Sequence, residues 1–392
     1  MWSLVRRRRS LSPLSAAVVS LAVLAPNSVP AQTLADLPED FFSGSDFRYV
    51  GPVGNRVSAV VGEPGNANVY YFGAASGGVF KSEDAGHTWR PIFDDQEAQS
   101  IGALAVAPSD PNVVWAGTGE AFIRSNVSIG NGVYRSTDGG ESWSHMGLEA
   151  SGRVGRIAIH PGDPDIVFVA AAGHLYGTLD QFADSPAQQR GLYRTTDGGE
   201  TWTQVLSGGP NSGAIDIVMN PVNPRILFAA TWQMRMWTWG RESGGPESGL
   251  WMSRDGGDSW TRLEGNGLPR GVMGKIGLGV SPDDPDRVYA LIETSSNAAF
   301  AAFDDHEGTL WRSDDGGRSW RMVNADHALA QRPLYYTRMA VAPDDVDEVH
   351  FMSTAHNKSL DGGLTFSSIG GGDNHDMWID PLLPDRMIVG ND

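Results

Sequence analysis

The sequence predicts an all-β fold, a β-propeller built from four-stranded blades. Three observations predict it: an eight-residue motif that recurs six times, short segments rich in Val, Ile and aromatic residues between the copies, and the lack of a 3.6-residue helical pattern. Four short strands repeating every ~40–60 residues are typical of propeller blades. A helical solenoid and a β-sandwich are therefore excluded.

The repeated octet follows the pattern Ser/Thr-x-Asp-x-Gly-x-Ser/Thr-aromatic. It is typical of a hairpin turn, in which Asp is expected to accept backbone N–H bonds two residues further on while Gly adopts a positive φ. The closing aromatic residue, for example Trp143, is expected to insert between neighbouring blades. We interpret the motif aspartates as structural: Asp84, Asp138, Asp197, Asp255, Asp315 and Asp361.

Each unit is predicted to contain strands A to D, with a Pro-rich turn between A and B and the octet between C and D. Strand A is traced seven times, near Val57, Ala103, Arg156, Ile217, Leu278, Met339 and Met377, whereas the octet appears six times. We therefore expect about six complete blades and a partial seventh. We attribute the partial blade to C-terminal truncation of a longer protein that carries the remaining blades or domains. The alternative is that residues 33–50 supply the missing strands.

The N-terminus has the pattern of a signal peptide. Four arginines at 6–9 precede a 12-residue apolar run at 14–25, which is too short to span a bilayer, and Ala31 closes a small-residue cleavage site. The expected organisation is a signal peptide at 1–31, a linker at 32–45 and the propeller at 46–392. The mature chain is expected to be secreted or periplasmic, without a membrane span; the alternative is an uncleaved membrane anchor.

Composition excludes several function classes. The formal net charge of −18 argues against nucleic-acid binding, which needs a basic surface, and the absence of cysteine excludes disulfides, thiolate metal sites and a Cys nucleophile. His174, His356 and His375 match no metal-ligand spacing. Neither a metal site nor a cofactor is predicted.

The octets resemble the Asp-box (BNR) repeat. With the flanks at 77–82 and 191–199, they resemble the propellers of sortilin-type vacuolar sorting receptors, and most of all their secreted bacterial glycosyl hydrolase-like relatives. The resemblance covers residues 46–392 and implies the architecture but no activity, since such propellers include sialidases, xyloglucanases, sorting receptors and photosystem assembly factors. A xyloglucanase-like enzyme would place a catalytic Asp where this sequence has Ala75.

The site is expected on the face formed by the B–C and D–A connections, because the B–C loops are long and the octet turns are short. The carboxylates that are candidates for catalysis at the channel mouth are Glu120, Asp216, Glu293 and Asp376. We expect Glu120, Arg156, Arg56 and Asp376 to form one polar constellation; the alternative is a set of interblade salt bridges or a solvated channel. The residues expected to bind ligand are Arg56, Arg124, Arg156, His174, Tyr176, Trp232, Arg235, Trp237, Trp239, Arg338 and His375.

The connection at 232–241 is the richest of these loops, with three tryptophans and two arginines. These residues suit stacking on sugar rings or holding a peptide, and the alternative is a loop folded onto its own hydrophobic cluster. The leading hypothesis is an exported binding module that recognises a peptide or a polysaccharide through the B–C/D–A face. The second is a xyloglucanase-like or sialidase-like glycoside hydrolase that uses mouth carboxylates. A structural part of a larger envelope protein is the third.

Overall fold

The computed structural model describes residues 56–124, 127–174, 189–237, 240–294 and 308–392, which belong to one compact unit, Val53–Asp392. The expected signal peptide, the expected linker and the segment 33–50 lie outside the described residues. Within the described ranges, no helix is both long enough and apolar enough to cross a membrane.

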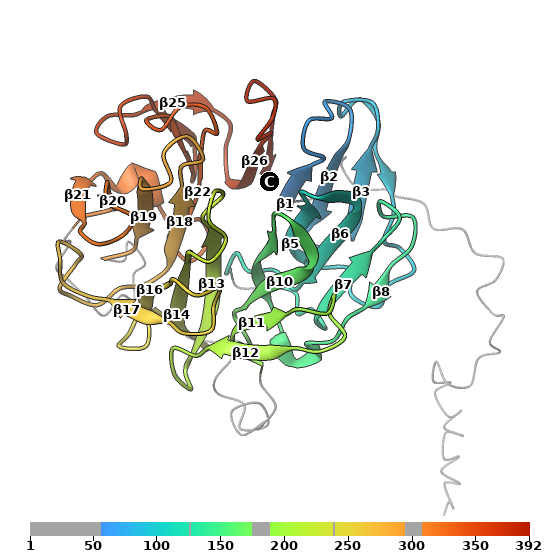
Figure 1. The fold of residues 1–392 in the computed structure, drawn as a ribbon, viewed down its shortest axis with the longest axis horizontal. Helices are drawn as coiled ribbons and strands as arrows, with labels where there is room; N and C mark the ends of the chain where they lie inside the picture. Colours follow the sequence, from blue (N-terminus) through green and yellow to red (C-terminus); the bar gives the residue numbers. More distant parts are fainter. Residues whose placement is uncertain (1–55, 125–126, 175–188, 238–239, 295–307) are drawn as a thin grey trace, which may run out of the picture. The chain divides into compact units, whose positions relative to one another are not determined.

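The described residues form five four-stranded antiparallel sheets, one five-stranded sheet and one two-stranded sheet, which are the blades of a β-propeller (Figure 1). The strands of blades 1 to 3 are β1 (Val57–Gly62), β2 (Tyr70–Ala74), β3 (Val79–Ser82), β4 (Arg90–Pro91); β5 (Ile101–Ala107), β6 (Asp110–Thr118), β7 (Val133–Ser136), β8 (Ser144–His145); and β9 (Val154–His160), β10 (Asp163–Ala171), β11 (Gly191–Thr195), β12 (Thr203–Leu206).

The strands of blades 4 to 6 are β13 (Ser212–Met219), β14 (Leu227–Trp237), β16 (Gly249–Ser253), β17 (Thr261–Leu263); β18 (Ile276–Val280), β19 (Val288–Ile292), β20 (Leu310–Ser313), β21 (Arg321–Asn324); and β22 (Arg338–Val341), β23 (Val349–Met352), β24 (His356–Ser359), β25 (Ser367–Gly370). Blade 7 consists of β26 (Asn374–Ile379) and β27 (Met387–Asn391). Blade 4 has an additional strand, β15 (Gly240–Ser243), paired with the far end of β14. Two short 3₁₀ turns complete the described elements, η2 (Glu149–Ser151) and η3 (His327–Ala330).

The first strand of each blade lies at the centre of the propeller. These inner strands pack against one another in chain order, and β26 packs against β1 (Figure 1). All seven predicted A strands are confirmed, and the inner ring is closed by a blade of two strands. Side chains join the closing blades, because Asp380 accepts from the Gly65 amide at 2.9 Å and the Val60 amide donates to Asp376 at 3.2 Å.

The octets form the turns between the third and fourth strands, as predicted, but their hydrogen bonds differ from the expected pattern. In the second octet, Asp138 accepts from the amide of Ser142, four residues on, at 2.9 Å, and from its hydroxyl at 2.6 Å. The amide two residues on, Gly140, donates instead to Ser136 Oγ at 2.8 Å. The prediction that Asp binds the amide two residues on is wrong, because the first Ser/Thr of the octet takes that donor.

Each octet after the first packs against the preceding blade. The side chain of Trp143 reaches back to donate to the carbonyl of Ile92 at 2.8 Å, and Trp202 donates to that of Met146 at 2.6 Å. The second glycine of the octet lies where a side chain would meet the neighbour: a Cβ on Gly257 would lie 2.7 Å from the ring of Phe168. The repeated octet thus determines both the turn and the contact between blades.

Candidate functional site

One end of the propeller gathers the polar residues that the sequence singled out. The inner strands begin at this end, and the connections between the second and third strands lie there too, so Arg56, Glu120, Lys275 and Glu293 are brought to the same face. This is the B–C/D–A face of the prediction. The octets lie at the opposite ends of the strands.

Four charged side chains from four blades meet in the channel. Arg156 Nε lies 3.0 Å from Asp216 Oδ1, and its Nη1 lies 3.3 Å from Asp376. Arg338 approaches Asp216 at 3.4 Å. Asp216 also accepts from the amide of Leu278 at 3.0 Å, which ties blade 4 to blade 5. These pairs link blades 3, 4, 6 and 7 and form interblade salt bridges, the alternative that the sequence analysis left open.

Glu120 belongs to a separate group at the mouth. It pairs with Arg56 and, at 3.3 Å, with Arg124, and it is almost fully buried. Within the described residues, it does not pair with Arg156. The expected single constellation of Glu120, Arg56, Arg156 and Asp376 is therefore two groups, because Glu120 follows β6 and pairs with Arg124 four residues on, whereas Arg156 lies within β9 and pairs with Asp216 and Asp376.

The segment that follows β6 closes the channel from this face. Ala121, Phe122 and Ile123 are each 1% exposed, and the amide of Ile123 donates to the carbonyl of Leu334 at 3.0 Å. The ring of Phe122 lies beneath two cations, with Lys275 Nζ 5.1 Å and the Arg338 guanidinium carbon 5.6 Å from its centroid. We call residues 119–124 the plug. The sequence predicts a long B–C loop here. No local pattern in the sequence distinguishes an open loop from a buried segment.

Glu293 and Lys275 are buried beside the plug. Glu293 accepts from the hydroxyl of Ser243 and, at 2.8 Å, from the amide of Lys275. Burial raises the pKa of Glu293 despite these bonds. Burial, with the charge of Arg338, lowers the pKa of Lys275 to about 7. Because Glu293 accepts from the amide of Lys275, it holds the residue just before β18 in place.

Sequence reasoning missed a second group at the mouth, formed by Tyr335, His375 and Asp392. The Tyr335 hydroxyl donates to Asp392 at 2.9 Å, and His375 Nε2 lies 2.7 Å from the same carboxylate, so Nε2 is the donor. Although burial opposes it, these bonds and the charge of His375 lower the pKa of Asp392. His375 was selected from sequence. Its partners come from segments far apart in the chain and gave no local signal.

The tryptophan-rich connection is a β-hairpin rather than a loop. β14 runs on to Trp237 and pairs with β15, so its side chains alternate between two faces. Trp232, Met234 and Met236 are buried in the core, and the Trp232 indole donates to Ser243 at 3.0 Å. The opposite face presents the partly exposed Gln233, Arg235 and Trp237. Trp232 is thus a core residue. One face of the hairpin packs on a hydrophobic cluster and the other is partly exposed, so the hairpin combines the two predicted arrangements.

The remaining predicted residues are dispersed. His174 is partly buried after β10, where burial and the nearby Arg153 and Arg190 lower its pKa. His356 is the first residue of β24 in blade 6, where its Nε2 is 2.8 Å from Nδ1 of His350. Tyr176 and Trp239 lie outside the described residues.

The chemistry of the site follows from burial. Glu120, Asp216, Glu293 and Asp376 are each at most 6% exposed, and each is held by cations or hydrogen bonds. Glycoside hydrolysis needs two carboxylates that reach the scissile bond from solvent-accessible positions. These four hold blades and plug together, whereas Arg235 and Trp237 on the hairpin, and Arg56 and Arg124 beside Glu120, are partly exposed.

Comparisons with known proteins agree with the fold. The model of the family described as Sortilin-Vps10 (sortilin, neurotensin receptor 3) matches residues 131–268. A xyloglucanase of Paenibacillus sp is 24% identical over 90% of this chain and 35% of its own length. Xyloglucanase Xgh74A of Acetivibrio thermocellus is 22% identical over 95% of this chain and 44% of its own length. The chain thus spans less than half the length of these curated relatives.

Solved structures share the architecture at low identity. YCF48 bound to D1 peptide superposes with a TM-score of 0.53 at 16% identity, covering 87% of this chain and 92% of that one. An ancestral GH74 enzyme superposes with a TM-score of 0.51 at 19% identity, covering 81% of this chain and 40% of that one. Taken with the six octets and the blades that they close, these similarities show that the chain is a β-propeller, similar to those of xyloglucanases and of the Sortilin-Vps10 family.

Proposed function

We propose that this propeller is a glycan-binding domain that holds a polysaccharide chain on its B–C/D–A face. The alternating β14–β15 hairpin carries the proposal, because it fixes a partly exposed indole and guanidinium, Trp237 and Arg235, on a strand anchored in the core. An indole stacks on the apolar face of a sugar ring, and a guanidinium donates to its hydroxyls. Polysaccharide is favoured over peptide because the curated relatives that match 90–95% of the chain are named xyloglucanases.

Binding without turnover is the expected behaviour of this chain. Its four sequence-predicted carboxylates are buried in ion pairs and hydrogen bonds, and freeing any of them would leave a buried charge unpaired. Arg56 and Arg124 on the plug side are partly exposed and extend the polar surface beside the mouth.

The experiment is calorimetric titration of the chain with xyloglucan oligosaccharides, cello-oligosaccharides and a peptide library, combined with a reducing-end assay. Trp237→Ala is expected to weaken glycan binding by about tenfold, the loss of roughly 1.4 kcal/mol of stacking. Arg235→Ala is expected to weaken it less. The charge-matched control is Arg225→Ala on the exposed turn before β14, at the opposite end of the strands. Unchanged affinity in Trp237→Ala would exclude the hairpin, and binding of peptides alone would exclude the glycan.

A second candidate function is glycoside hydrolysis, favoured by the names of the same relatives. In that case xyloglucan incubated with the chain would gain reducing ends, and Glu120→Gln would abolish the gain. Turnover that survives Glu120→Gln, Asp216→Asn, Glu293→Gln and Asp376→Asn would mean that other carboxylates act.

We also propose that residues 1–31 direct export and are removed after Ala31, with 32–45 as a linker to the propeller at 46–392. The basic start and the short apolar run support this proposal. N-terminal sequencing of the chain recovered from the periplasm or the medium tests it. An intact Met1 in the exported fraction would contradict it.

A further inference from the structure

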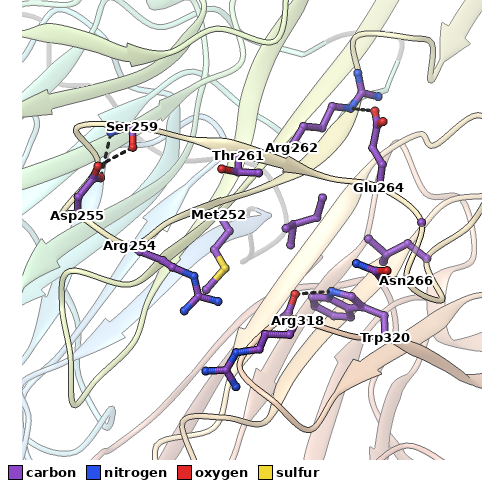
Figure 2. A pocket seen from close by; sticks show the side chains of 14 residues that line it. Met252, Arg254, Asp255, Ser259, Thr261, Arg262, Glu264, Asn266, Arg318 and Trp320 are labelled. Atoms are coloured by element: carbon purple, nitrogen blue, oxygen red, sulfur yellow. Dashed lines mark hydrogen bonds and ion pairs between the residues drawn. The ribbon is translucent and has the colours of Figure 1, made fainter.

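A groove of about 450 Å³ lies between blades 4 and 5, beside the octets of both blades and the first residues after β17 (Figure 2). One wall comes from β17 and the octet of blade 4, and the other from the octet of blade 5. Its floor is formed by Met252, Leu268 and Trp320, which are each 5% exposed. A groove of this volume falls within the range of sites that bind small ligands or short peptide segments.

At this junction a recurrent interblade contact is made by a different side chain. The residue just before the octet is Arg135, Arg194 and Arg312 in blades 2, 3 and 5. Each of these donates to the carbonyl of the first Gly-Gly glycine in the next octet, at 3.1, 2.8 and 3.1 Å. In blade 4 the same position is Met252. An uncharged thioether cannot make this bond, so the carbonyl of Gly316 accepts instead from Arg254 at 3.5 Å, and Met252 lines the groove.

The rim of the groove is positively charged in an otherwise acidic protein. Arg254 and Arg318 are both exposed and reach toward the groove from neighbouring blades (Figure 2). Arg254 donates to the carbonyl of Gly316 at 3.5 Å and Arg318 to that of Asp315 at 3.0 Å, and among the described residues no carboxylate pairs with either guanidinium. The formal net charge of the chain is −18, so this local charge is not shared by the surface as a whole.

The acids that also line the groove already have hydrogen-bond or ion-pair partners within blade 4. Both oxygens of Asp255 accept bonds within its own octet, from Ser253, the Ser259 amide and the Ser259 hydroxyl. Glu264 pairs with Arg262 at 2.9 Å. The two rim guanidinium groups therefore remain available for an anion from outside the chain.

The end wall is rigid. The segment after β17 crosses to blade 5, where the carbonyl of Asn266 accepts from the Trp320 amide at 2.7 Å. Gly267 has a φ of +96°, and a Cβ there would collide with the carbonyl of Trp320. Because the backbone is held on both sides, the groove is preformed, which lowers the ordering cost of binding.

We infer that this groove binds an acidic peptide segment of a partner protein, with an aliphatic side chain over Met252 and Trp320 and flanking carboxylates on Arg254 and Arg318. Charge complementarity selects the acids, and the apolar floor selects the aliphatic residue. A peptide is favoured because β17 is the outermost strand of its sheet, and in the described part of the chain no strand pairs with its outer edge. An extended segment can add to such an edge by backbone hydrogen bonds.

The test is fluorescence anisotropy of a blocked, fluorescein-labelled Glu-Leu-Glu-Leu-Glu peptide titrated with the full chain. The matched probes are Lys-Leu-Lys-Leu-Lys and Gln-Leu-Gln-Leu-Gln. We expect saturable binding of the acidic probe alone, with a Kd below about 1 mM, weakening as salt is raised. The double variant Arg254→Glu with Arg318→Glu is expected to weaken it by at least about tenfold, since two charge-assisted contacts become repulsive.

Met252→Arg is the second variant, because it introduces the arginine that stands at this position in blades 2, 3 and 5 and places its side chain in the groove. We expect it to abolish binding while the thermal midpoint stays the same or rises. Arg225→Glu carries the same kind of charge reversal on an exposed turn and is expected to change affinity less than about twofold. Equal binding of the lysine probe, unchanged affinity in Met252→Arg, or no saturable binding of the acidic probe would each overturn the inference. Glycan binding on the other face is expected to be unaffected by all of these variants.

Discussion

At the scale of single residues, the octet is a small hydrogen-bonded network repeated six times. Its first Ser/Thr is buried and accepts an amide bond, while its hydroxyl proton goes to the Asp; in the second octet these bonds are Ser136 Oγ to Asp138 at 2.7 Å and Gly140 N to Ser136 Oγ at 2.8 Å. The Asp then binds the residue four positions on. Each side chain therefore satisfies backbone groups that the tight turn would otherwise leave without partners.

Ser136→Ala is expected to destabilise the protein by about 1–2 kcal/mol, because the amide of Gly140 becomes a buried donor without an acceptor. The neighbouring Thr137→Ala, at the exposed variable position of the same octet, is expected to change stability by less than about 0.5 kcal/mol. Urea denaturation measures both. Equal effects of the two substitutions would mean that the hydroxyl network contributes nothing.

The octet aspartates also predict how stability depends on pH. Side-chain hydrogen bonds from the seventh residue of the octet are the main cause that lowers the pKa of Asp84, Asp138 and Asp315 to about 2. An unfolded Asp titrates near 3.9. Because the folded-state pKa is the lower one, this stabilisation is complete above about pH 4 and is lost as the pH falls toward 2. Thermal midpoints measured from pH 7 to pH 2 should drop within that window, and Asp138→Asn should drop less steeply. A flat profile would contradict the assignment.

At the scale of elements, the connections on the B–C/D–A face differ in how they bury their side chains. The plug after β6 buries its side chains and closes the channel, whereas the β14–β15 hairpin buries one face and presents the other. Both begin as direct continuations of second strands that are rooted in the core. In the hairpin, successive side chains alternate between a buried and a partly exposed face. In the plug, three consecutive side chains are all buried.

Phe122→Ala tests the plug. The ring is 1% exposed and lies against Lys275, Arg338 and the imidazole of His375, so its removal is expected to cost about 3–4 kcal/mol. Ile129→Ala, in the same connection but 48% exposed, is the control and is expected to be nearly neutral. Differential scanning calorimetry compares the two. A small effect at Phe122 would show that the plug is not anchored by its aromatic residue.

At the scale of the whole molecule, side chains in the channel connect blades that are distant in sequence. Asp216 holds Arg156 and Arg338 from blades 3 and 6, and Asp376 of blade 7 accepts from Val60 of blade 1. The ring is thus bonded across its centre as well as around its circumference. A change at one of these residues should affect the cooperativity of the entire propeller.

Asp216→Ala is expected to destabilise the fold by about 3–5 kcal/mol, because it leaves the buried Arg338 and the channel-facing Arg156 without this partner. Asp258→Ala removes an exposed partner of Arg194 and should cost at most about 1 kcal/mol. Urea unfolding followed by both tryptophan fluorescence and circular dichroism measures the loss, and the two probes should remain coincident. Similar losses in the two variants would show that the channel pairs act like surface ion pairs.

The sequence by itself determined the architecture, because each octet encodes its own turn and the blade spacing repeats around it. The A strands, the turn positions and the aromatic contact between blades were all predictable from local pattern. The partners of the channel residues were not: Arg156 meets Asp376 from a strand more than two hundred positions away, and Glu120 turns from Arg156 toward Arg124. Only the tertiary structure decided these, because ring closure sets which inner-strand residues face each other across the channel. The groove at Met252 is likewise decided by the tertiary structure, because its lining residues come from both blade 4 and blade 5.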